Sequence, residues 1–247
     1  KNRLNSLRTE ILSGTTGQET LQALDAAVGQ LDLLVSDLQN AVMKTRMQPI
    51  GRLFQKYPRI ARDLARNLGK DVELALAGED TEIDKTMIED LSDPIIHLIR
   101  NAVDHGVESP LERTAAGKPE KSEVRLEARQ EGDHIVILIA DDGRGMNAEK
   151  LRAKALEKGL IGNEEANTMD ERQSFNLVFL PGFSMAPKVS DVSGRGVGMD
   201  VVRTNIQKLN GSIEIKSALG KGTTFVISLP LTLAILPVLI VKLDEQP

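Results

Sequence analysis

The segment 141–146, DDGRGM, contains residue types that could recognise a nucleotide base, and it follows an apolar run, 135–140, that predicts a β-strand. Glycine permits positive φ angles and lets a ligand approach the backbone closely. A carboxylate at a strand end that faces a pocket can accept a hydrogen bond from an exocyclic amine such as that of adenine. Asp141 is therefore a candidate base-recognition residue, and the alternative for this segment alone is an acidic surface turn.

A second candidate is an amide within a predicted helix over about residues 85–105. His97 and Asn101 are four residues apart and share one face of this helix, and Asp104 follows three residues later. The carbonyl oxygen of Asn suits Mg²⁺, which prefers hard oxygen ligands and keeps several waters. The alternative is an Asn that faces solvent or caps the helix.

A third candidate is the glycine-rich segment 194–198, GRGVG, which precedes a predicted helix over 199–209. Glycine-rich backbone at the start of a helix presents free N–H groups to phosphate. The segment differs from dinucleotide and P-loop fingerprints, because no predicted strand precedes it and no Gly-Lys-Ser/Thr follows. The preceding residues, 159–196, have weak periodicity, and loops of this length are usually functional lids or disordered.

The N-terminal part of the chain, residues 1–46, contains no proline and no aromatic residue. Its apolar residues step by three and four, as in a heptad repeat: Leu21, Leu24, Val28, Leu31, Val35, Leu38 and Val42. A break at 14–17 predicts a hairpin of a short helix to about Ser13 and a long helix over about 18–46. Because the short arm covers less than half of the long helix, we expect an intermolecular bundle; the alternative is packing on its own globular domain.

Apolar periodicity and turn residues predict the remaining elements. Helices are predicted over about 53–68, 85–105, 147–158 and 199–209, and strands over 72–77, 124–129, 135–140, 212–216 and 223–229. A last predicted strand, 236–243, lies beyond a domain that is already closed, so it would begin another domain.

The composition limits the classes of function. The chain has 247 residues, a net charge of −5 and 2% aromatic residues, which argues against nucleic-acid binding. The absence of cysteine excludes disulfides and thiolate metal sites. The longest apolar stretch, 229–241, contains two prolines and is too short to span a bilayer. No signal peptide is recognised, so we expect a cytoplasmic protein without membrane insertion.

Together, four segments resemble the ATP-binding fold shared by gyrase-type ATPases, heat-shock chaperone ATPases, histidine kinases and mismatch-repair ATPases. The helix with Asn101 resembles the N-box, 141–145 the first glycine box, 182–184 the F-box and 194–198 the second glycine box. Within that group the chain resembles the CheA family of chemotaxis histidine kinases. This resemblance is carried by residues 97–106 (HLIRNAVDHG), 179–184 (FLPGFS), 193–200 (SGRGVGMD) and 229–235 (LPLTLAI).

The resemblance implies an α+β architecture, in which a helical hairpin precedes an α/β sandwich with a mixed, mainly antiparallel sheet and helices on one face. It implies a dimerisation hairpin with a truncated first helix (1–47), an ATP-binding kinase domain (48–230) and the start of an adaptor-binding regulatory domain (231–247). The implied reaction is transfer of the ATP γ-phosphate to a histidine on a separate phosphoacceptor domain in two-component signalling. The implied partners are a second copy through residues 1–47, the phosphoacceptor domain and, for the full-length protein, an adaptor, chemoreceptors and response regulators.

The resemblance also implies roles for single residues. Asp141 would accept from the adenine amine, and Asn101 would hold Mg²⁺ that bridges the phosphates. His97 could orient the attacking imidazole, and Lys188 or Arg195 could reach the terminal phosphate from the lid. The other predicted nucleotide contacts are Asp104, His105, Gly143, Gly145, Met146, Ser184, Gly194, Gly196, Val197, Gly198, Met199 and Thr223.

Two rival functions remain. An ATP-hydrolysing conformational machine of the same fold would be expected to carry a Glu in the N-box helix to activate water, and the His at position 97 favours the kinase instead. A non-catalytic dimeric scaffold would have a vestigial pocket, and the intact Asn101, Asp141 and glycine boxes argue against it.

Overall fold

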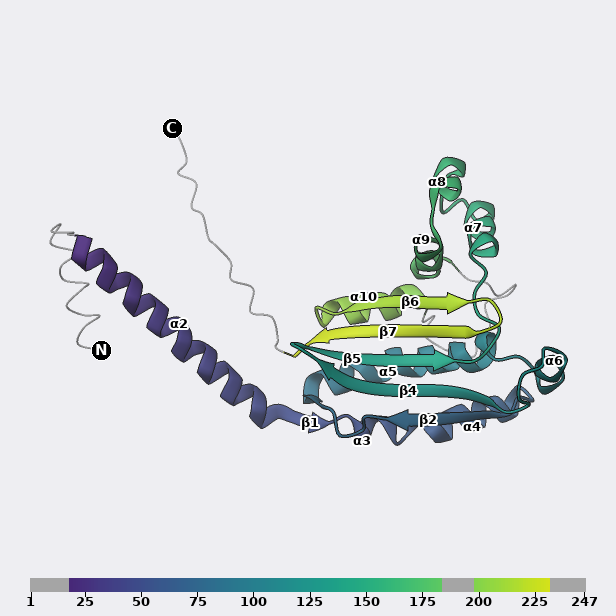
Figure 1. Ribbon diagram of the computed structural model, residues 1–247, viewed down its shortest axis with the longest axis horizontal. Helices are drawn as coiled ribbons and strands as arrows, with labels where there is room; N and C mark the ends of the chain where they lie inside the picture. The colour runs from purple at the N-terminus through teal and green to yellow at the C-terminus, as the bar shows by residue number, and fades with distance from the viewer. Residues whose placement is uncertain (1–17, 184–197, 232–247) are drawn as a thin grey trace. The chain divides into compact units, whose positions relative to one another are not determined.

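The computed structural model describes residues 18–183 and 198–231 (Figure 1). The chain divides into two compact units, Lys1–Met47 and Gln48–Pro247. The predicted short helix before Ser13 and the predicted strand 236–243 lie outside the described residues. No helix in the described part of the chain is both long enough and apolar enough to cross a membrane.

Apart from Met47, the described part of the first unit is one 29-residue helix, α2 (Gln18–Arg46), with the predicted bounds. At a rise of 1.5 Å per residue, a helix of this length extends over roughly 43 Å. Large apolar side chains along it remain exposed within the chain: Val28, Leu31, Leu33, Leu34, Val35, Leu38 and Val42. The heptad pattern therefore corresponds to an apolar surface that the described residues do not bury.

The second unit is built on a five-stranded sheet with the order β2-β4-β5-β7-β6. The strands are β2 (Val72–Ala77), β4 (Ser122–Glu131), β5 (His134–Asp141), β6 (Ser212–Ala218) and β7 (Gly222–Pro230). β2 pairs with β4 in parallel, and the other three ladders are antiparallel. A separate short ladder joins β1 (Met47–Pro49) to β3 (Glu82–Asp84). The prediction of a mixed, mainly antiparallel sheet is confirmed.

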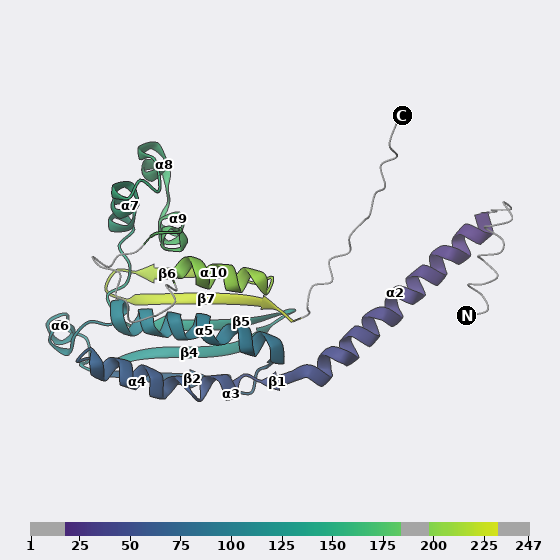
Figure 2. The ribbon, with the colours of Figure 1, turned by 180° about the vertical axis from the view of Figure 1, so that it is seen from behind.

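Helices cover one face of this sheet, as predicted (Figure 2). They are α4 (Tyr57–Asn67), α5 (Lys85–Asn101) and α10 (Met199–Lys208). The apolar side of α5 is wholly buried through Leu91, Ile95, Leu98 and Ile99. Asp84 caps its N-terminus by accepting a hydrogen bond from the Thr86 N–H at 2.8 Å. The core thus lies between α5 and the sheet and holds the C-terminal end of this helix in place.

Three stretches differ from the predicted elements. The helix predicted over 53–68 is two helices, α3 (Gly51–Phe54) and α4, because the chain turns before Tyr57. The weakly periodic stretch that begins at residue 159 was predicted as a long loop, and this is wrong for residues 163–179. After α7 (Ala148–Glu157), this part of the chain forms α8 (Asn163–Thr168), α9 (Glu171–Asn176) and a 3₁₀ turn. α6 (Pro110–Ala115) was also not predicted. The helices α3, α6, α8 and α9 have four to six residues, which are too few to show helical periodicity. Capping boxes begin α6 and α9.

Candidate functional site

Asp141 is the last residue of β5 and pairs with Val124 on β4 and Thr223 on β7. It is 8% exposed, and its Oδ1 accepts a hydrogen bond from the Gly143 N–H at 3.0 Å. Burial raises the pKa of this carboxyl to about 6, against the effect of backbone N–H groups of Gly143 and Thr223 that favour its ionised form. The predicted base-recognition residue is therefore a largely desolvated hydrogen-bond acceptor at a strand end.

Glycines surround this carboxylate where the backbone of three segments comes close. A Cβ on Gly106 would lie 2.9 Å from the Asp141 Cγ, and one on Gly143 would lie 2.1 Å from the Gly106 carbonyl oxygen. A Cβ on Gly222, at φ +100°, would lie 1.9 Å from the backbone oxygen of Asp141. Only glycine allows these segments to approach one another at this distance.

The first glycine-rich segment is also tied to the β6–β7 hairpin. Met146 donates its N–H to the Ser217 Oγ at 2.8 Å, and Ser217 donates in turn to the Gly222 carbonyl at 3.0 Å. The Ser217 hydroxyl also lies 3.0 Å from that of Thr223, which is 5% exposed. Ser217 was not predicted, because a serine within an alternating strand carries no sequence signal of its own.

Asn101 is the last residue of α5 and is followed by a π-helical turn, Ala102–Gly106. Its Nδ2 donates to the Sδ of Met199 at 3.0 Å, and Met199 is the first residue of α10. This contact joins the helix that carries the amide to the helix that follows the second glycine-rich segment. The π-helical turn ends at Gly106, beside Asp141, so the two predicted halves of the site meet there.

The histidines on this helix differ in their surroundings. Burial, together with Arg100 and His105, lowers the pKa of His97, whereas Asp200 on α10 opposes this effect. A neutral imidazole is therefore expected at position 97 near pH 7. His105 is mostly exposed, and its Nε2 lies 3.7 Å from Asp104 Oδ2.

A lysine that the sequence did not predict holds the π-helical turn. Lys70 Nζ donates to the backbone carbonyls of Val103, Asp104 and Val107 at 2.9, 2.5 and 2.9 Å. These carbonyls lie where a helix end leaves acceptors without intrahelical partners. Burial lowers the pKa of Lys70. Lys70 therefore stabilises the turn between Asn101 and Asp141.

A buried charge cluster lies beside the first glycine-rich segment. Arg113, on α6, has a side chain only 1% exposed and donates to both carboxylate oxygens of Asp142, at 3.1 and 2.7 Å. It also donates to Glu108 at 3.1 Å, and Glu108 accepts a further hydrogen bond from Lys118 at 2.8 Å. Burial acts to raise the pKa of Asp142, but hydrogen bonds from Ser122 and Arg113 outweigh it and leave the pKa lowered.

Some predicted site residues can be placed and others cannot. The described part of the chain brings together Asn101, Asp141, Gly143, Gly145, Met146, Met199 and Thr223, with His97 one turn before Asn101 and Gly198 at the start of α10. Asp104 and His105 lie on the π-helical turn between Asn101 and Gly106. Six predicted residues lie outside the described residues: Ser184, Lys188, Gly194, Arg195, Gly196 and Val197.

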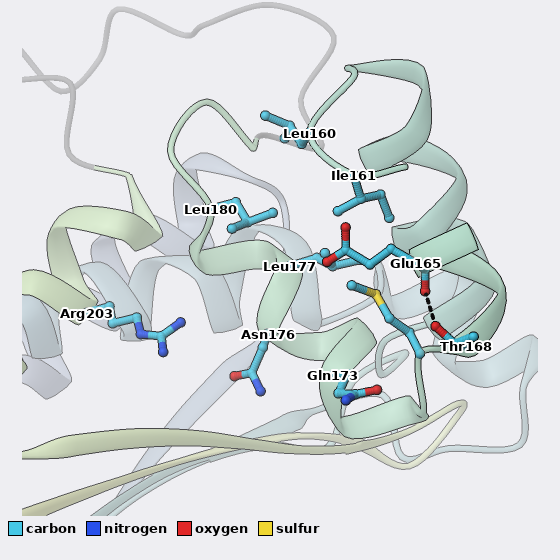
Figure 3. Close-up of a pocket in the computed structure, with 10 residues that line it drawn as sticks. Leu160, Ile161, Glu165, Thr168, Gln173, Asn176, Leu177, Leu180 and Arg203 are labelled. Atoms are coloured by element: carbon cyan, nitrogen blue, oxygen red, sulfur yellow. Dashed lines mark hydrogen bonds between the residues drawn. The ribbon is translucent and has the colours of Figure 1, made fainter. Parts of the chain in front are cut away.

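A separate pocket of about 580 Å³ lies among α8, α9, the 3₁₀ turn and α10 (Figure 3). Apolar side chains occupy one side of it, and Arg203 of α10 extends toward the other. The Arg203 guanidinium lies 5.5 Å from the centre of the Phe179 ring. The lining residues are Leu160, Ile161, Glu165, Thr168, Met169, Gln173, Asn176, Leu177, Leu180 and Arg203, so this pocket is distinct from the predicted site.

The mixed sheet with helices on one face, and the glycine-packed carboxylate at a strand end, define a domain of the α/β sandwich class. The chain belongs to the histidine kinase-, DNA gyrase B-, and HSP90-like ATPase family, whose model matches residues 90–233. The predicted resemblance to this group is confirmed.

The chain is also similar in sequence to individual chemotaxis and histidine kinase proteins. The chain is 52% identical over 246 residues to the sensor histidine kinase CheAY of Helicobacter pylori, an alignment that covers 100% of this chain and 31% of that protein. It is 45% identical to the chemotaxis protein CheA of Bacillus subtilis (90% of this chain, 33% of that protein) and 50% identical to that of Salmonella typhimurium (86% and 31%). The chain thus spans about a third of the length of these relatives.

Proposed function

We propose that this chain is the ATP-binding catalytic core of a chemotaxis histidine kinase, which transfers the ATP γ-phosphate to a histidine on a separate phosphoacceptor domain. The observation that carries the proposal is the buried Asp141 carboxylate, which is packed among glycines and linked through Gly106 to the helix that carries Asn101. The names of the relatives, chemotaxis protein CheA and sensor histidine kinase, support it.

The residues at Asp141 fit an adenine base. An ionised carboxylate can accept about four hydrogen bonds. Backbone N–H groups of Gly143 and Thr223 use part of this capacity, and the rest suits an exocyclic amine. Gly106 leaves the space beside the carboxylate free of a side chain.

The residues at Asn101 fit Mg²⁺. Because the Nδ2 of Asn101 donates to Met199, the carbonyl oxygen is the end of the amide that can act as a metal ligand. When bound, Mg²⁺ would neutralise charge on the phosphates. Neutral His97, on the same helix face, would orient the attacking imidazole of the phosphoacceptor by a hydrogen bond.

The test of this function is a transfer assay. The chain is mixed with a separate phosphoacceptor domain and ATP labelled at the γ-phosphate, with and without a chelator of Mg²⁺. We expect acid-labile phosphohistidine only when the metal is present. Release of inorganic phosphate without transfer would instead favour the ATP-hydrolysing machine, and absence of nucleotide binding would favour the scaffold.

Asn101→Ala is expected to lower Mg²⁺-dependent transfer at least tenfold while metal-free ADP binding stays mostly intact. The reason is that the variant removes the amide oxygen proposed as the metal ligand but leaves the base site unchanged. Transfer rates and ADP calorimetry measure the two effects. Asn67→Ala, at the exposed end of α4, is the matched control. Full Mg²⁺-dependent activity in Asn101→Ala would remove this residue from the metal site.

We further propose that residues 1–47 dimerise the chain, that 48–230 form the catalytic domain and that 231–247 begin an adaptor-binding regulatory domain. In the full-length protein, an adaptor, chemoreceptors and response regulators would be the partners. The exposed apolar residues of α2 support dimerisation, because large apolar stripes are rarely left in water. We expect a concentration-dependent equilibrium between monomer and dimer.

Leu31→Glu is expected to shift this equilibrium to monomer without a change in nucleotide affinity. Burial of a leucine contributes about 1.5–3 kcal/mol, and the change acts once in each copy. Sedimentation over a range of concentrations measures it, with Gln30→Glu, an exposed neighbour off the apolar stripe, as the control for added charge. A wild-type chain that stays monomeric at high concentration would contradict the proposed dimer.

A further inference from the structure

Lys118 makes three close contacts behind the first glycine-rich segment. Its Nζ donates to the backbone carbonyls of Asp142 and Gly143 at 2.8 and 2.6 Å, and to the Glu108 Oε1 at 2.8 Å. The side chain is 17% exposed, so this ammonium group is mostly withdrawn from water. Two of its three contacts are thus to main-chain oxygens next to Asp141.

The peptide group between Asp142 and Gly143 connects Lys118 to Asp141. The peptide is planar, so the position of its carbonyl oxygen also fixes the direction of its N–H group. The oxygen accepts from Lys118, and the N–H donates to the Asp141 Oδ1 at 3.0 Å. A cation at the oxygen also polarises the peptide and strengthens the N–H as a donor.

Buried neighbours hold Lys118 in this position. Glu108 is paired with Lys118 through one carboxylate oxygen and with Arg113 through the other. Arg113 is itself anchored on the Asp142 carboxylate. Because the Arg113 and Glu108 side chains are only 1% and 10% exposed, this arrangement has little room to shift.

We propose that Lys118 is a positioning residue for adenine recognition, which acts through the Asp142–Gly143 peptide to set the orientation of the Asp141 carboxylate. The inference rests on the proposed function, in which Asp141 accepts a hydrogen bond from the adenine amine. Without the ammonium group, the Asp142 carbonyl keeps only the longer hydrogen bond from the Arg113 guanidinium, at 3.4 Å, so the peptide is less firmly held and its N–H can turn away from Asp141. The affinity that depends on the exocyclic amine would then fall, whereas contacts to ribose and phosphates would be kept.

The test compares ADP with purine riboside 5′-diphosphate, which lacks the exocyclic amine, by calorimetry on the whole chain. Wild type is expected to prefer ADP by about fivefold to 150-fold, the range for one buried hydrogen bond. Lys118→Met is expected to lose most of this preference, with unchanged affinity for the purine riboside nucleotide. Lys121→Met, an exposed lysine paired with Glu73, is the matched control and should bind like wild type.

The possible outcomes separate this inference from the proposed function. A wild type that binds both nucleotides equally would contradict base recognition by Asp141 itself. A wild-type preference that persists in Lys118→Met, or an equal loss for both nucleotides, would overturn the role of Lys118. If Lys118→Met does not fold, Lys118→Leu, which likewise removes both the donor and the charge, must show the same selective loss of ADP affinity.

Discussion

Gly222→Ala is expected to destabilise the chain by about 2–6 kcal/mol and to impair nucleotide binding strongly. Gly222 has φ +100°, and an added Cβ would lie 1.9 Å from the Asp141 carbonyl oxygen and 2.9 Å from the Asp142 Cα. These are backbone atoms of the neighbouring strand end, so no side chain can move aside. Relief of the clash would separate β5 from β7 where Asp141 pairs with Thr223.

Gly220→Ala provides a control in the same turn. Gly220 also has a positive φ of +76°, but no described atom lies within 4 Å of its added Cβ. Its substitution should cost only about 1–2 kcal/mol of backbone strain and leave ADP affinity unchanged. Urea unfolding and ADP calorimetry compare the two variants. Similar results for both would mean that the close approach of Gly222 to Asp141 does not hold in solution.

The sheet could be predicted from the sequence because apolar runs bounded by turn residues define its strands. Turn signals such as Gly69, at φ +63°, and caps such as Asn147, which accepts from the Lys150 N–H, set several element ends. The short helices α6, α8 and α9 could not be predicted, because six residues do not show a helical period.

Only part of the candidate site could be predicted, because sequence patterns do not show contacts between residues that are far apart along the chain. Asp141 and Asn101 were found because their chemical types stand out beside glycines and on an apolar helix. Lys70, Arg113 and Lys118 were missed, because each acts on groups more than 20 residues away in the sequence, which only the fold brings close. A surface lysine and a lysine that holds a peptide group have the same appearance in a sequence.

Asp141→Asn is expected to stabilise the unliganded chain while it weakens nucleotide binding. Burial raises the pKa of Asp141 from 3.8 to about 6, so the native state holds this proton more tightly than the unfolded state. Native stability therefore falls as pH rises between these values, and above pH 6 the ionised carboxylate costs up to about 3 kcal/mol. A neutral amide avoids this cost, so the gain of the variant should be largest near pH 8 and shrink as pH falls from 6 toward 3.8.

Nucleotide affinity is expected to change in the opposite direction. The carboxylate presents oxygens both to the Gly143 N–H and, as proposed, to the adenine amine. An amide must direct its NH₂ at one of these two donors, which lowers ADP affinity by about 1–3 kcal/mol. Urea unfolding at pH 8 and pH 5, with ADP calorimetry at pH 8, measures both effects, and Asp90→Asn on the exposed side of α5 is the control. A stability of the variant relative to wild type that does not fall from pH 8 to pH 5 would contradict the desolvation of Asp141, and equal ADP affinities would contradict its contact with the base.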